Sequence, residues 1–158
     1  MANTQSMTTS FMGELLTATH NFGTAPVRAA STADTFRGAL YLASATINAS
    51  TTVYSSTGEV TGAGYSAGGV VVTNATPPTA TNASTTAGVA YWTPSASLTY
   101  TSVTLTTAFD AVLIYNASQS NKAVSVHTFG SQTITAGTFT LTMPANTTST
   151  ALLRLATT

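Results

Sequence analysis

From Thr35 onward the chain alternates apolar and polar residues in short runs that are separated by turn-forming residues. Alternation of this kind is typical of strands with one buried face. In residues 35–44, for example, Phe36, Leu40 and Leu42 fall on one side. Many short strands with turns between them predict an all-β fold, a β-sandwich or jelly-roll-like domain. The predicted strands cover residues 35–44, 51–56, 69–75, 89–92, 98–107, 109–116, 122–129, 132–135, 138–143 and 151–156.

The N-terminal residues follow a different pattern. Over residues 6–20, apolar side chains recur at helical spacing, which predicts one short helix, and residues 21–34 have the composition of an extended arm. The sequence therefore predicts two parts, residues 1–34 and a β-domain over 35–158. A helix this short must dock its apolar face, either on its own domain or on a neighbouring subunit. In the second case the anchor would be Phe11, Leu15 and Leu16.

One predicted hairpin brings together the two residues that are most suited to catalysis. Joining 109–116 to 122–129 through a turn around 117–120 sets Leu113 opposite Val124 and Asp110 opposite His127. An acid beside an imidazole could belong to a Ser-His-Asp triad, but the chain has no G-x-S-x-G elbow. We interpret the pair as a sheet or interface contact. His20 lies on another element, so the sequence predicts no catalytic residue and no metal site.

Residues 62–67 match the dinucleotide-binding pattern G-x-G-x-x-[GA]. That pattern needs a helix after the glycines and an acid about 20 residues further on. Here Gly68 and Gly69 lead into a run of valines, and no acid follows at the required distance. We therefore expect the glycines to allow tight corners, with no cofactor bound.

Composition changes the picture of the surface. Only 5% of residues are charged and the net charge is zero, which argues against binding to nucleic acid or to an anionic membrane. The polar surface must consist mainly of hydroxyls, because 36 of the 158 residues are threonine. A neutral surface lacks the usual protection against association, so a partner or an oligomer is expected.

Several common sequence signals are absent. The chain has no cysteine, no apparent secretory signal and no apolar run long enough to span a membrane, so we expect folding in a reducing cytosol. Without such a signal, the Asn-x-Ser/Thr sites at Asn48, Asn74, Asn82, Asn116 and Asn146 are expected to occur by chance.

Two surface functions have candidate residues. The threonines of 133–142 could match ice or a sugar, but strand alternation also explains them as the wet side opposite Phe139, Leu141 and Met143. Trp92, with Tyr91 and Tyr100, could form a sugar-stacking platform or belong to the core, and the core is the more common case.

Four stretches carry a family resemblance: "SFMGELLTATHNF" (10–22), "DTFRGALYLASATINASTTVYSSTGEVTGAGYSAGG" (34–69), "FDAVLIYNASQSNKAVSVHTFG" (109–130) and "GTFTLTMPANTTSTALLRLA" (137–156). Together they resemble a family of small structural proteins of tailed bacteriophages. The resemblance implies a β-rich, non-enzymatic virion protein that is assembled in the bacterial host cytoplasm.

From this resemblance we expect a capsid decoration or cement protein, forming a homotrimer that contacts the major capsid protein or another virion protein without a cofactor. Two alternatives remain open. One is a tail, fibre or head-spike component that binds a host glycan, and the other is a free carbohydrate-binding or adhesin module.

Overall fold

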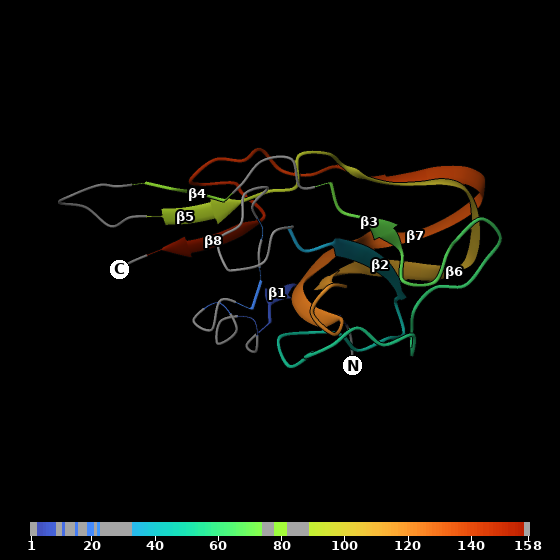
Figure 1. The fold of residues 1–158 in the computed structure, drawn as a ribbon. Coiled ribbons are helices and arrows are strands. Elements are labelled where there is room, and N and C mark those ends of the chain that lie inside the picture. Colours follow the sequence, from blue (N-terminus) through green and yellow to red (C-terminus); the bar gives the residue numbers. More distant parts are fainter. Residues whose placement is uncertain are drawn as a thin grey trace.

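The computed structural model describes residues 3–8, 11, 15, 19–20, 22, 33–73, 78–81 and 89–156. Within these ranges the regular secondary structure is almost entirely β-strand, and turns and loops connect the strands (Figure 1). The strands are β1 (Ser6–Met7), β2 (Phe36–Leu42), β3 (Val70–Val71), β4 (Thr79–Ala80), β5 (Val89–Trp92), β6 (Leu98–Asn116), β7 (Lys122–Leu141) and β8 (Leu153–Ala156).

The strands form two antiparallel sheets. The larger sheet has the order β1-β7-β6-β2-β3, and the smaller has the order β4-β5-β8. The smaller sheet extends to one side of the larger one in Figure 1. The all-β class predicted from the sequence is confirmed, whereas the sandwich or jelly-roll arrangement stays a prediction.

A long hairpin dominates the larger sheet. β6 has 19 residues and β7 has 20, where the sequence pattern predicted five shorter strands. The predicted breaks are positions at which the pairing between the strands shifts register, as around Ala108 and Ala136. Such bulges bend a strand pair without ending it. The two strands therefore curve together as one ribbon (Figure 1).

The first part of β6 packs over β2. The Tyr100 hydroxyl donates a hydrogen bond to the Gly38 carbonyl at 2.8 Å, and a side chain at Gly38 would collide with Leu98. The main core fills the space between these segments and extends to the smaller sheet. Its members are Phe11, Phe22, Phe36, Leu40, Val60, Val72, Trp92, Leu98, Tyr100, Val103, Leu105, Phe109, Val112, Ile114, Val124 and Leu153.

The opposite face of the larger sheet is also buried. Tyr41, Leu113 and Tyr115 lie on this face, where Ile47 packs against them. Tyr54 stacks on Tyr115 with ring centroids 4.6 Å apart. The segment that contributes Tyr54 was predicted to be a strand over 51–56, but its pairing is limited to one bridge between Val53 and Lys122.

The predicted hairpin exists, but its predicted register was wrong. Leu113 lies opposite Val126 instead of Val124, and Val112 lies opposite His127. The turn closes on the pair Asn116–Lys122, and a further register shift follows at Tyr115. Together these changes move the pairing by two residues. Each side chain therefore keeps its expected face but gains a different neighbour.

Two predictions for segments outside the long hairpin also change. Ser6 and Met7, expected to begin a helix, form β1 and pair with Ser125 and Val126 of β7. Phe11 and Leu15 are helical, but most of the predicted helix and arm lies outside the described residues, so the helix stays a prediction. Thr79–Ala80, which lie outside the predicted strands, form β4.

Candidate functional site

Residues 58–69, which we call the glycine-rich segment, are held in place by the buried carboxylate of Glu59. Glu59 accepts hydrogen bonds from the Tyr54 hydroxyl at 2.6 Å, the Tyr65 hydroxyl at 2.7 Å and the Gly68 amide at 2.7 Å. The Tyr65 hydroxyl in turn accepts a bond from the Leu40 amide. Burial, followed by the hydrogen bond to Glu59, raises the pKa of Tyr65, so both tyrosines act as neutral donors.

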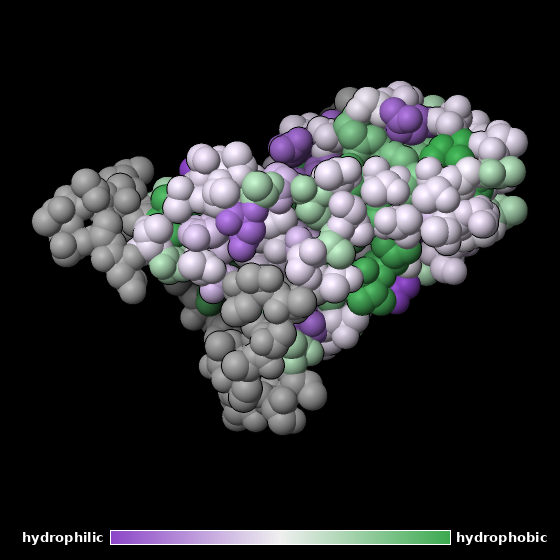
Figure 2. Space-filling model, turned by 90° about the horizontal axis from the view of Figure 1, so that it is seen from above, coloured by the Kyte–Doolittle hydropathy of each residue, from purple (hydrophilic) through white to green (hydrophobic). Residues whose placement is uncertain are grey.

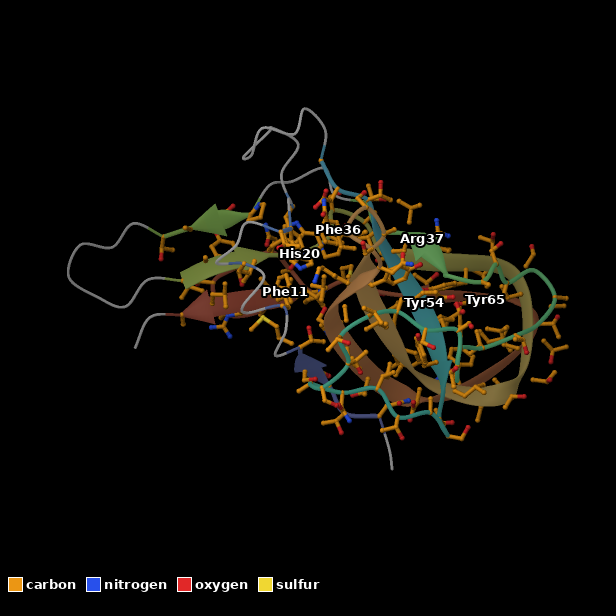
Figure 3. All side chains as sticks on the ribbon, turned by 60° about the horizontal axis from the view of Figure 1, so that its bottom comes forward. Phe11, His20, Phe36, Arg37, Tyr54 and Tyr65 are labelled. Carbon is orange, nitrogen blue, oxygen red and sulfur yellow. The ribbon has the colours of Figure 1, made fainter. Side chains whose placement is uncertain are left out.

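Arg37 supports the same segment from β2. Its guanidinium donates to the carbonyls of Gly68 and Gly69 at 3.1 and 2.5 Å, and the Tyr115 hydroxyl also donates to Gly68. Figure 3 shows Arg37, Tyr54 and Tyr65 together over this part of the larger sheet. The Gly68 amide, which could otherwise face a phosphate, is occupied by an acidic side chain. In this conformation the amide already has an acceptor and is not available to a phosphate.

The glycines themselves serve the corners, as the sequence predicted. Gly64, Gly68 and Gly69 have positive φ values of 76°, 85° and 71°. A side chain at Gly62 would collide with the Thr104 carbonyl of β6, because the segment passes close to that strand. No helix follows, since Val70 and Val71 form β3.

Asp110 and His127 do not form the predicted cross-strand pair. The Asp110 carboxylate accepts a hydrogen bond from the Asn3 amide at 2.5 Å. His127 Nε2 lies 2.8 Å from the Ser125 hydroxyl, two residues away on β7. The structure thus joins a serine to the histidine and places the acid elsewhere. Sequence reasoning missed Ser125, although its position two residues from His127 on one strand face was a usable signal.

The Ser125–His127 pair borders a polar cleft of about 320 Å³ between β1, β7 and residues 151–154. Burial lowers the pKa of His127 to about 4, so the imidazole is neutral at pH 7. Ser125 is fully buried within a regular strand, and the cleft has no acidic residue among the described ones that line it. A substrate could not reach the hydroxyl in this conformation, and nothing there would orient the imidazole as a triad acid does.

The other histidine is also part of the interior. His20 is buried against Phe11 and Phe36, and its Nδ1 lies 3.0 Å from the Asn116 amide. The same amide donates to Asp34 at 2.8 Å. Asn116 is fully buried, so this sequon is closed to modification in the folded protein.

The aromatic platform is excluded by burial. Trp92 and Tyr100 are each 2% exposed, and Trp92 packs against Phe22 with ring centroids 4.7 Å apart. Neither ring can stack on a sugar at the surface. The alternative interpretation, that these residues belong to the core, is correct.

The proposed anchor residues lie close to the same aromatic cluster. Phe11 is 2% exposed and contacts His20 and Phe22, and the half-buried Leu15 packs against this core. Figure 3 shows Phe11, His20 and Phe36 where the two sheets meet. Leu16 lies outside the described residues. In this conformation, the described anchor side chains pack on their own domain.

The hydroxyl side of the long hairpin is the main exposed feature. Ile134, Phe139 and Leu141 face the core and are half-buried, while the threonines beside them are exposed, as the wet-side interpretation predicted. The register shifts near Val103 and Leu105 break any regular spacing, which argues against an ice-binding array. The exposed threonines of the hairpin and its end are Thr99, Thr101, Thr106, Thr107, Thr133, Thr135, Thr138, Thr140 and Thr142. We call this set the threonine face.

Over the described residues, no group of three or more His, Cys, Asp or Glu side chains comes together that could hold a metal ion. No helix within these ranges has the length and apolar character needed to cross a membrane.

Comparison with protein-family models, with curated proteins and with solved structures finds no match to this chain.

Proposed function

We propose that this chain is a non-enzymatic structural protein of a tailed bacteriophage particle. It decorates or cements the capsid through contacts with other copies and with the shell. The assignment to a phage particle rests on the sequence resemblance. The threonine face supports a role in assembly, because it is a long, exposed and uncharged surface.

The observation that carries the proposal is the absence of charge along this surface. Between Lys122 and Arg154 the sequence contains no Asp, Glu, Lys or Arg. Figure 2 shows one side of the molecule, on which residues of intermediate hydropathy predominate. Hydroxyl groups can be wetted alone or bonded across an interface, and they are short, so little side-chain entropy is lost on binding.

The ionisable groups support a structural role. Glu59 holds the glycine-rich segment, Asp34 binds Asn116 and Gln119, and Asp110 binds Asn3. Each of these carboxylates already has an internal partner that fixes a loop or the N-terminal segment. Acid–base chemistry would require such a group to be freed from its partner and placed beside a substrate.

The proposed shell contact is the threonine face. An anchoring role for Phe11, Leu15 and Leu16 would require the N-terminal segment to leave the core in which Phe11 is buried. Many equivalent copies on a lattice make modest single contacts collectively strong, so each contact through this surface can be weak.

The test is binding to phage heads that were assembled without this chain. Heads and purified protein are mixed and sedimented, and saturable co-sedimentation is expected. Thr106→Lys/Thr133→Lys places charge on the threonine face and should reduce binding. Thr52→Lys/Thr57→Lys is the matched control, because these threonines are exposed on the segment that covers the other side of the sheet.

Failure of the wild-type protein to bind heads contradicts the decoration role. Equal loss of binding in both lysine variants contradicts the assignment of the contact to the threonine face. Binding to tails or to host glycans instead of heads would select the tail, fibre or head-spike alternative.

A further inference from the structure

The two edges of the long hairpin differ in how they are covered. On the β6 side, the Thr104 amide donates to the Ala63 carbonyl at 2.8 Å, and the Ala43 amide donates to the Ala108 carbonyl at 2.9 Å. The glycine-rich segment thus lies along this edge. On the β7 side, β1 pairs only with Ser125 and Val126. Beyond Thr128, no strand in the described part of the chain lies on the outer side of β7.

This uncovered edge lacks the usual protection. Exposed edge strands are normally blunted by charged residues, by proline or by a covering segment, because their free backbone groups pair with other strands. Residues 129–141 contain no charge and no proline. Bulges, a further protective device, interrupt this strand between Thr128 and Gln132 and near Ala136. Between these bulges and beyond Ala136, the edge offers backbone donors and acceptors with no charged residue or proline beside them.

The side chains along this edge suit a second copy of the same strand. Threonine pairs well with threonine across antiparallel strands, and Thr99 already lies opposite Thr140 within the hairpin. Two identical edges without charge meet without repulsion. Phe129, Phe139 and Leu141 are half-buried near the edge, with the rings of Phe129 and Phe139 5.2 Å apart, so a second copy would complete their burial.

We propose that two copies of this chain pair through the outer edge of β7, residues 129–141, and form one continuous antiparallel sheet about a two-fold axis. The inference rests on the proposed function as an assembly protein and names its first partner. It predicts a dimer as the basic unit, because a self-complementary edge closes with two copies. The homotrimer expected from the family resemblance would instead require a heterologous contact between two different surfaces.

The test uses the isolated full-length protein without phage particles. Sedimentation equilibrium of the wild type should give twice the 16.0 kDa mass of one chain. Thr138→Lys/Thr140→Lys places like charges on the β7 edge strand and should raise the dimer dissociation constant at least about tenfold. Thr99→Lys/Thr101→Lys is the matched control, because these threonines lie on β6, where they border a groove with the glycine-rich segment. It should keep the wild-type dimer. Circular dichroism checks that both variants fold.

A second measurement does not depend on charge. The chain has no cysteine, so a single introduced cysteine can form a disulfide only with the same residue of another copy. In an antiparallel self-pairing, the residue nearest the axis faces its own copy at a Cβ separation of about 4.5–5.5 Å. Among Thr133→Cys, Thr135→Cys and Thr138→Cys, at least one should oxidise readily to a linked dimer, whereas Thr101→Cys should not.

A wild-type monomer, a mass of three chains, a dimer insensitive to the β7 lysines or equal cross-linking at Thr101 would overturn the pairing. Since head binding is measured separately, failure here leaves the proposed function standing. A wild-type dimer that does not bind heads would contradict the function and leave the pairing standing.

Discussion

The two ends of the β6–β7 hairpin have opposite characters although they belong to the same two strands. At the end formed by residues 109–116 and 122–126, both faces are buried, and residues Ala111 to Asn116 are all inaccessible. At the other end, residues 98–107 and 130–141, one face packs on the core and the other carries exposed threonines.

The difference follows from what covers each end. The segment around Ile47 and Tyr54 closes the second face at the buried end. Beyond the bend, the described residues leave that face open, and the side chains there change from aliphatic to hydroxyl. One strand pair can therefore supply both the core and the proposed assembly surface, and substitutions at the two ends should have very different costs.

The largest effect is expected at the bend itself. Phe109 is fully buried and its ring contacts Phe129 and Phe139. Phe109→Ala removes this packing and leaves a cavity, which should lower the free energy of unfolding by about 3–5 kcal/mol. Urea denaturation followed by fluorescence measures the change. A loss below about 1 kcal/mol would mean that the bend is not packed as described.

The covered edge should be the next most sensitive region. Gly64 has a φ of 76°, and a side chain there would collide with the Ser102 carbonyl of β6. Gly64→Ala should cost about 1–3 kcal/mol. Gly130, at the uncovered edge, has open space around the position of a side chain, so Gly130→Ala should be nearly neutral. Equal costs at the two glycines would contradict the contrast between the edges.

Glu59 tests how the covering segment is held. Glu59→Gln replaces the carboxylate that accepts bonds from Tyr54, Tyr65 and Gly68 with an amide whose NH2 faces some of these donors. We expect a loss of about 1–3 kcal/mol in the free energy of unfolding, measured by urea denaturation. Unchanged stability would show that these bonds do not fix the segment.

A pH titration probes the buried cleft beside β7. Burial lowers the pKa of His127 from 6.5 to about 4, so between these values the unfolded chain binds a proton that the folded chain does not. Above pH 6.5, His127 is neutral in both states and does not change the free energy of unfolding. As the pH falls from 6.5 toward 4, protonation of His127 in the unfolded chain lowers the free energy of unfolding. His127→Gln should reduce this loss, measured as the urea midpoint at pH 7 and pH 4.5. If the urea midpoints of the wild type and of His127→Gln fall equally between pH 7 and pH 4.5, the lowered pKa of His127 is contradicted.

The smallest effect is expected on the threonine face. Thr138 is exposed, and Thr138→Ala should change the free energy of unfolding by no more than about 0.5 kcal/mol. The same urea assay measures this change. A large loss would mean that the face is packed within the molecule and is not available to a partner.

The sequence predicted where strands and corners lie better than it predicted how far a strand continues. Alternating residues located β2 and β5 closely, and the glycine-rich segment was correctly interpreted as a set of corners. The length of β6 and β7 was missed, because residues such as Gly130 and Gly137 resemble turns but lie within a strand. A bulge and a turn differ in cross-strand pairing, which one sequence does not specify.

The polar contacts were harder to predict. Asp110 and His127 were placed opposite each other because the turn was taken as one residue too short and the bulge at Tyr115 was not recognised. The role of Glu59 had a signal that could have been used. It is the single acid of its glycine-rich segment, with tyrosines five residues before it and six residues after it. Two aromatic hydroxyls near one acid suggest a buried acceptor.

We propose that the neutral threonine face of the β6–β7 hairpin is an assembly surface of a phage particle. Cryo-electron microscopy of intact particles, at a resolution that traces the chain, shows which surfaces of the protein are in contact. We expect copies on the outside of the head, with the threonine face in contact with the shell or with another copy. Finding the chain absent from the particle, or present with that face turned to solvent, would contradict it.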